Sequence, residues 1–310
     1  MNVLIHTLQG VVPVFLLIVI GSILKHRKVI GPAFQKSSSI ICFKLGLPAL
    51  IFLKIAGLDF SGVFNINEIL ILLAIALITM ITTLLLSLRL KDVTQRGAFS
   101  QGAFRGNIAI IGLALVLNLY GEDLAARGAM IVAVMLPVFN ILSVIALTIP
   151  RHGMSLEGLI RSLKNIITNP IIMAVLAALG FSLFKIPVPV LLGRLLKYLA
   201  DLALPLALIN IGGSLSARGF REKGKIALAA ALIKVVLLPV IAVIIFYKKG
   251  YNQEELGLIF LIAGAPTALS SHIMADAMDN DGDLAALIIM VSTTLAAVTT
   301  LIGISIINSL

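Results

Sequence analysis

The stretch Leu45-Gly46-Leu47-Pro48-Ala49-Leu50-Ile51 has a counterpart 157 residues further along the chain, Leu202-Ala203-Leu204-Pro205-Leu206-Ala207-Leu208. Two more proline pairs have the same separation, Pro13 with Pro170 and Pro32 with Pro189. This separation is close to half of the 310-residue chain, and chance gives roughly one proline match per ten separations tested. The sequence therefore predicts an internal duplication, with one half at residues 1–150, a connector at 151–165 and a second half at 166–310.

The composition is that of a membrane protein. Hydrophobic residues make up 60% of the chain, charged residues make up 12%, and the mean hydropathy is +1.12. A soluble domain of this length could not bury so much apolar surface, so the lipid bilayer must be its solvent. Apolar windows of about 20 residues predict an all-α membrane protein with ten transmembrane helices. The windows are 3–24, 36–57, 67–88, 98–119, 126–149, 166–184, 190–215, 226–247, 255–277 and 284–308.

The charges of the loops predict the orientation of these spans. Loops after the odd-numbered spans carry 14 lysine and arginine residues, whereas loops on the opposite face carry four. Because basic loops stay in the cytoplasm, we expect a multi-pass protein of the cytoplasmic membrane with both termini outside. Each half has an odd number of spans, so the second half must be inverted, and inverted repeats are typical of secondary transporters. The net charge of +10 is then expected to reflect topology and not nucleic-acid binding.

Two windows contain residues that interrupt a helix. The fourth contains Arg105-Gly106-Asn107-Ile108-Ala109-Ile110-Ile111-Gly112. The ninth contains Ala263-Gly264-Ala265-Pro266-Thr267-Ala268-Leu269-Ser270-Ser271-His272, in which Pro266 removes a backbone donor. Either interruption alone could be a kink that neighbouring helices fill. Paired interruptions in two related halves instead predict a substrate site, where half-helix N-termini offer N–H groups to an anion.

The predicted site residues flank these two interruptions. The substrate-binding candidates are Gly106, Asn107, Ile108, Pro266, Thr267, Ala268, Ser270 and Ser271, and Gly112 and Pro266 are expected to keep the helices broken. The hydroxyl groups among them could equally bond to freed carbonyl groups. The four histidines and one cysteine form no metal-ligand cluster, so the sequence predicts no metal and no cofactor. Neither a catalytic constellation nor a phosphate-binding Walker loop is present, so we do not expect an enzyme or an ATP-driven pump.

One pair of charges follows the repeat. Lys44 and Asp201 are also 157 residues apart, near the middle of their spans. We expect either a structural ion pair between the halves or a relay for protons or ions, and Lys197, one turn before Asp201, could compete for the carboxylate.

Of four further basic or titratable residues, three have two interpretations. Arg105 could draw anions toward the site or anchor its half-helix at the interface. Lys234 could be a counter-charge for an anion or extend to the cytoplasmic surface, whereas Lys54 is expected to extend to the outer surface. His272 could couple transport to protons, or remain neutral and hydrogen-bonded.

Several motifs resemble those of the auxin efflux carrier family, whose members include plant auxin exporters and bacterial organic-acid permeases. They are Asn107-x4-Gly112 followed by Leu119-Tyr120-Gly121, the segment from Pro266 to Ala275, Asn169-Pro170, and Ala203-Leu204-Pro205-Leu206-Ala207-Leu208. The resemblance covers essentially the whole chain. Three departures stand out: only about 15 residues connect the halves, Ala114 stands at a proline position of the family, and Ser271 replaces a second proline.

The resemblance implies a fold and a site. Spans one, two, six and seven would form a scaffold unit that makes a homodimer, and spans three to five and eight to ten would form a mobile transport unit. The broken fourth and ninth helices would cross near the middle of the membrane. By the same resemblance, Asn107 would contact a substrate carboxylate and Pro266 would be the proline of the ninth-span crossover. The substrate of the plant members is not carried over.

Together these observations predict a secondary transporter that moves a small organic anion, a carboxylate, by alternating access. The expected partners are the anion, the lipid bilayer and a second copy of the chain. Two other classes remain open: a sodium-coupled symporter of the bile-acid type, which has a similar inverted architecture, and a membrane sensor that does not translocate its ligand.

Overall fold

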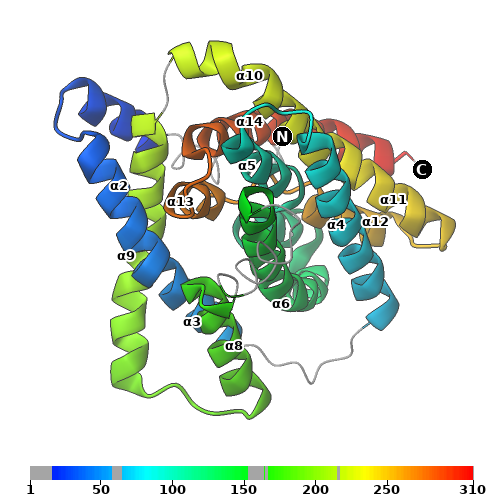
Figure 1. The fold of residues 1–310 in the computed structure, drawn as a ribbon. Coiled ribbons are helices and arrows are strands. Elements are labelled where there is room, and N and C mark those ends of the chain that lie inside the picture. Colours follow the sequence, from blue (N-terminus) through cyan, green and yellow to red (C-terminus); the bar gives the residue numbers. More distant parts are fainter. Residues whose placement is uncertain (1–15, 58–64, 153–163, 165–166, 215–216, 310) are drawn as a thin grey trace.

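The structure is a computed structural model that describes residues 16–57, 65–152, 164, 167–214 and 217–309 (Figure 1). Over these residues the chain is all-α, with one isolated β-bridge and no strand. Six helical stretches are long and apolar enough to cross a membrane, as expected for a multi-pass membrane protein. They are Pro32–Ala56, Ile66–Ser87, Asp123–Arg151, Val190–Gly213, Phe220–Lys248 and Gly282–Ile307.

The helices follow the predicted windows closely, and each described window contains a helix. The first is Leu16–His26. The others are α2 (Pro32–Ile41), η1 (Cys42–Gly46), α3 (Leu47–Ala56), α4 (Ile66–Ser87), α5 (Val93–Phe104), η2 (Ile108–Gly112), α6 (Leu113–His152), α8 (Pro170–Leu183), α9 (Val190–Ser214), α10 (Ala217–Leu232), η3 (Ile233–Leu237), α11 (Leu238–Lys248), α12 (Gln253–Ala263), α13 (Ser270–Ala277) and α14 (Gly282–Ile307), where η marks a π-helical turn. Pro13, the start of the first predicted span and most of the predicted connector lie outside the described residues.

Short polar side chains begin several of these helices. Asn65, Asp92, Asn169 and Asp281 each accept a hydrogen bond from a backbone N–H in the first turn of the helix that follows. Asn252 does the same for α12 and forms a full capping box with Glu255. These caps satisfy backbone donors that a helix start leaves free, so they fix where the helices begin.

Prolines explain two of the π-helical turns. Pro48 follows η1 by two residues, and Pro239 follows η3 by two residues. A proline has no N–H and crowds the carbonyl group one turn earlier, so the helix widens there and continues. The helical runs from Pro32 to Ala56 and from Ala217 to Lys248 therefore remain continuous.

The boundary predicted between the fourth and fifth spans coincides with a break in the helical backbone. The stretch labelled α6 (Leu113–His152) consists of two helices that meet at Gly121, whose backbone is non-helical, with φ 81° and ψ −172°. Glycine adopts a positive φ without steric cost, so this residue turns the chain within a single position. The two predicted spans therefore meet at a kink.

The helices gather in two groups (Figure 1). Helix α3 packs against α8 and α9, and α2 lies beside α9, at one side of the molecule. Helices α4, α5, α6, α10, α11, α12 and α14 make up the other side, and α13 contacts both α2 and α14. In the first group, a Cβ on Gly21 would lie 2.1 Å from the carbonyl oxygen of Ile209. The helix Leu16–His26 and α9 thus cross in backbone contact, as small residues allow between membrane helices.

Candidate functional site

The two predicted interruptions meet in space. Residues 105–107 separate α5 from η2, and residues 264–269 separate α12 from α13; we call these two segments the crossover. The N–H of Asn107 donates to the carbonyl of Pro266 (2.7 Å), and the N–H of Ala268 donates to the carbonyl of Arg105 (3.1 Å). Gly106 and Thr267 form the antiparallel β-bridge between them. Each break therefore satisfies backbone groups of the other, which is necessary because lipid offers no hydrogen bonds.

Neighbouring side chains fix the crossover in place. The hydroxyl of Thr267 donates to the carbonyl of Gly102 in α5 (2.7 Å), and the N–H of Thr267 donates to Ser292 Oγ in α14 (3.1 Å). A Cβ at Gly106 would lie 3.0 Å from Lys234 Cε and 3.2 Å from the carbonyl oxygen of Ala265. Glycine at this position thus lets the two breaks approach closely.

Two buried cations hold the ends of the half-helices. Lys234 Nζ donates to the carbonyl of Ala263, the last residue of α12, where the helix dipole favours a positive charge. Arg105, at the end of α5, donates from Nη2 to Asn140 Oδ1 (2.7 Å) and from Nη1 to Met274 Sδ. Lys234 is therefore buried against the crossover and does not extend to the cytoplasmic surface.

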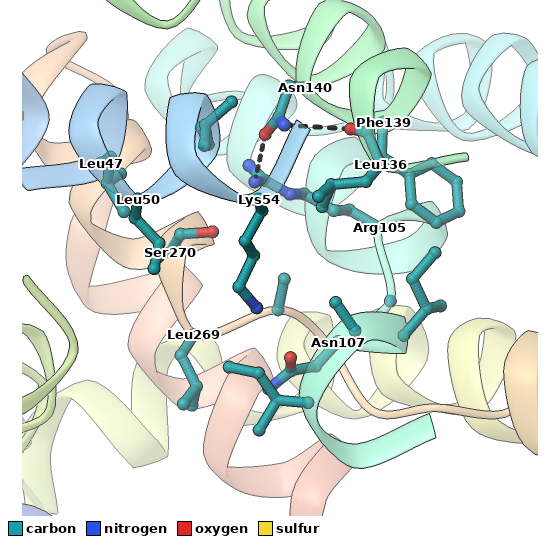
Figure 2. A pocket seen from close by; sticks show the side chains of 16 residues that line it. Leu47, Leu50, Lys54, Arg105, Asn107, Leu136, Phe139, Asn140, Leu269 and Ser270 are labelled. Carbon is teal, nitrogen blue, oxygen red and sulfur yellow. Dashed lines mark hydrogen bonds between the residues drawn. The ribbon is translucent and has the colours of Figure 1, made fainter. Parts of the chain in front are cut away.

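A cavity of about 60 Å³ lies against the crossover, and 16 residues line it (Figure 2). Six of the predicted site residues are among them: Arg105, Gly106, Asn107, Ile108, Ala268 and Ser270. The remaining lining residues are Leu47, Leu50, Ile51, Lys54, Ala109, Ile110, Leu136, Phe139, Asn140 and Leu269. None of the sixteen is acidic, and two are basic, so the cavity favours a negatively charged ligand.

Asn107 is the polar centre of this cavity. Its side chain is buried, and its Nδ2 has no hydrogen-bond partner among the residues that the structure describes. An unsatisfied buried amide donor costs about 1–3 kcal/mol, so such groups are uncommon and call for an explanation. A ligand that accepts a hydrogen bond in the cavity would supply the missing partner.

Other predicted residues support the crossover or lie elsewhere. Pro266 and Thr267 form the crossing itself and do not line the cavity. Ser271 is buried, and its hydroxyl has no hydrogen-bond partner within the described part of the chain. Gly112 was expected at the break, but it lies inside the π-helical turn η2, where its N–H bonds to the carbonyl of Asn107 (3.2 Å). The break is therefore at residues 105–107, where the chain is extended to pair with the opposite segment.

His272 and the Lys44–Asp201 pair are separate from this cavity. His272 Nδ1 lies 2.9 Å from the carbonyl oxygen of Gly282, and the ring is buried. The expected ion pair between Lys44 and Asp201 is wrong: Asp201 binds Lys197 on its own helix (3.1 Å), and both Lys44 and Asp201 are exposed. A partner one helical turn away is always within reach, which a residue on another helix is not.

Among the lining residues that were not predicted, two have polar side chains. Asn140 binds Arg105 and also donates to the carbonyl of Leu136 (2.9 Å); an asparagine inside an apolar window was the available signal. Lys54 was expected to extend to the outer surface. Instead, its side chain extends from α3 into the cavity, toward Asn107 and Leu269 (Figure 2).

A separate charged cluster joins α4, α6 and α12. Arg127 on α6 donates to Glu68 Oε2 on α4 from Nε (3.0 Å) and Nη2 (2.9 Å), and to Glu255 Oε1 on α12 from Nη1 (2.6 Å). The guanidinium also lies 5.5 Å from the centre of the Tyr251 ring. Because α12 leads directly into one segment of the crossover and α6 follows the other through η2, this cluster ties together helices that position the cavity.

Comparison with known proteins gives the family. A family model described as "Membrane transport protein" matches residues 6–304. The chain belongs to this family. An "Uncharacterized transporter" of Methanothermobacter thermautotrophicus is 25% identical to this membrane transport protein over 295 residues, which cover 94% of this chain and 95% of the relative. The resemblance to the auxin efflux carrier family is thereby confirmed, and both matches point to a transporter.

Proposed function

We propose that this membrane transport protein carries a small organic anion with a carboxylate group across the cytoplasmic membrane by alternating access. One observation carries the proposal: Asn107, whose Nδ2 has no hydrogen-bond partner among the described residues, lines a cavity whose described lining contains basic and no acidic side chains. A carboxylate oxygen accepts from such an amide, and its charge matches the surrounding cations. A neutral polar ligand would satisfy the amide but not the charges.

Three groups would bind the anion from the crossover side. Asn107 Nδ2 donates directly, and Arg105 provides a positive charge from behind, where Asn140 orients its guanidinium. Residues 108–110 begin the helix that leads into α6, and the first-turn N–H groups of a helix have no acceptor within it. These N–H groups and the positive end of the helix dipole favour an anion at this position.

The size of the cavity limits the ligand in this conformation. A volume of about 60 Å³ corresponds to about four water molecules. It holds a carboxylate with a short carbon chain, and a longer substrate requires the surrounding helices to separate.

The proposed architecture is the one expected from the sequence: ten spans in two inverted repeats, both termini outside, and a homodimer through the scaffold unit. Its support is the packing of α3 against α8 and α9, because this group contains the second, sixth and seventh predicted spans. The cavity lies between α3 and the crossover, so it lies between the two proposed units. A displacement of the crossover past α3 would then expose the cavity first to one side of the membrane and later to the other.

Counterflow in proteoliposomes tests this function. Vesicles loaded with one of a panel of short monocarboxylates should take up the same labelled carboxylate, and Asn107→Ala should raise the half-saturating concentration at least about tenfold, because one charge-assisted hydrogen bond is lost. Correct folding of the variant is checked by its elution volume and unfolding temperature. Binding without counterflow would indicate a sensor, and dependence on external sodium would indicate the symporter. Unchanged affinity in folded Asn107→Ala would refute the site.

A further inference from the structure

We infer that Lys54 is the residue that selects for the charge of the ligand: its ammonium group, carried by α3, binds the same carboxylate that Asn107 binds from the crossover. This inference rests on the proposed function. It assigns a binding role to a helix that contributes neither of the two breaks.

The position of Lys54 on α3 directs it toward the cavity. Leu47, Leu50, Ile51 and Lys54 all line the cavity, and they follow one another at intervals of three, one and three residues. This spacing places four side chains on one face of a helix. The lysine thus continues the face that three apolar residues turn toward the crossover, and its side chain points into the cavity that Asn107 and Leu269 also line (Figure 2).

Lys54 is also the uncommitted cation at this site. Arg105 donates to Asn140 and Met274, and Lys234 donates to Ala263. Lys54 forms no hydrogen bond or ion pair with any residue that the structure describes, although ten of the fifteen other residues that line the cavity are apolar. A partly desolvated ammonium group without an anion is unfavourable, so an anionic ligand stabilises it.

The arrangement has a consequence for transport. Asn107 belongs to the crossover, whereas α3 is held by α8 and α9. A carboxylate bound to both residues bridges the two groups of helices. When the crossover moves away from α3, the anion loses the ammonium group while it keeps the amide, so its affinity falls on that side and release becomes easier.

Binding measurements on the purified protein in lipid nanodiscs test the role of Lys54. The probes are sodium salts of straight-chain monocarboxylates with two to six carbons and the neutral amides of the same acids. The strongest-binding acid and its amide are then measured against Lys54→Gln, Lys54→Met and Lys54→Arg. Lys248→Gln, which removes the same charge from the exposed end of α11, is the matched control.

We expect both neutral variants to bind the acid about ten- to a hundredfold more weakly and the amide within about twofold of wild type, since only the charged ligand loses a charge-assisted bond. Lys54→Arg and Lys248→Gln should retain most of the affinity. Without ligand, Lys54→Gln should unfold no more easily than wild type, because it removes an uncompensated cation; a purely structural role would lower the unfolding temperature instead.

Two results would overturn the inference, and they are distinguishable. If both neutral variants bind the acid as well as wild type does while Asn107→Ala binds it weakly, Lys54 has no role and the proposed function stands. If no acid binds to the wild type, or Asn107→Ala binds as tightly as wild type, the cavity is not the site and both proposals are wrong.

Discussion

The cluster around Arg127 allows a stability prediction that can be worked out bond by bond. In Arg127→Met, the Glu68 carboxylate loses the two N–H donors that bind its Oε2, and its Oε1 has no partner to begin with. Removing one member of a buried ion pair costs about 3–5 kcal/mol, and Glu68 is only 2% exposed. Because the Arg127 side chain is 26% exposed, we expect the lower end of this range, about 3 kcal/mol.

The second carboxylate of the cluster supplies the internal comparison. Glu255 is 26% exposed and also accepts from the N–H of Asn252 (3.0 Å), which it keeps in the variant. Losing the Arg127 contact at this half-exposed position costs about 1 kcal/mol or less. Glu255→Gln should therefore destabilise the protein much less than Arg127→Met.

The free energy of unfolding can be measured from the SDS fraction that unfolds the protein in mixed detergent micelles. Adding Glu68→Gln to Arg127→Met should recover most of the loss, because the double variant no longer buries an unpaired carboxylate. The reasoning fails if Arg127→Met is no worse than Glu255→Gln, or if the double variant is as unstable as the sum of the two single variants.

Two further predictions concern the crossover and the topology. Gly106→Ala should lower the free energy of unfolding by about 1–3 kcal/mol, because its Cβ would press on Lys234 and Ala265. Gly180→Ala is the control: this glycine lies in a helix with open space around it, so the substitution should raise the free energy of unfolding by about 0.5–1 kcal/mol. Equal effects would show that the crossover is not tightly packed. Cysteines introduced at Lys164 and Lys248, with Cys42 replaced by Ser, should react with a membrane-impermeant reagent from opposite sides of the membrane, and labelling of both in intact cells would contradict the ten-span arrangement.

The helices were predictable from the sequence because lipid imposes a strong and simple constraint. Apolar stretches of about 20 residues must be helical, and described windows such as 67–88 and 284–308 correspond to α4 and α14 within two residues. Pro266 predicted the second break because a proline lacks the backbone N–H that a continuous helix needs. Gly112 was assigned less well, because a glycine alone does not say whether the chain turns, kinks or continues.

The roles of the membrane cations were not predictable, since they depend on contacts between distant parts of the chain. Lys44, Lys54 and Lys234 all lie inside apolar windows and look alike in sequence. The structure exposes Lys44, turns Lys54 into the cavity and uses Lys234 to satisfy the carbonyl at the end of α12. They differ in the nearest group that can accept a hydrogen bond from the ammonium group. For Lys234 this acceptor is the carbonyl of Ala263, which the break at Pro266 leaves free. For Lys54 the described lining of the cavity contains no carboxylate, and no carbonyl group of the described residues accepts a hydrogen bond from its ammonium group. The acceptor that fits best is the ligand itself.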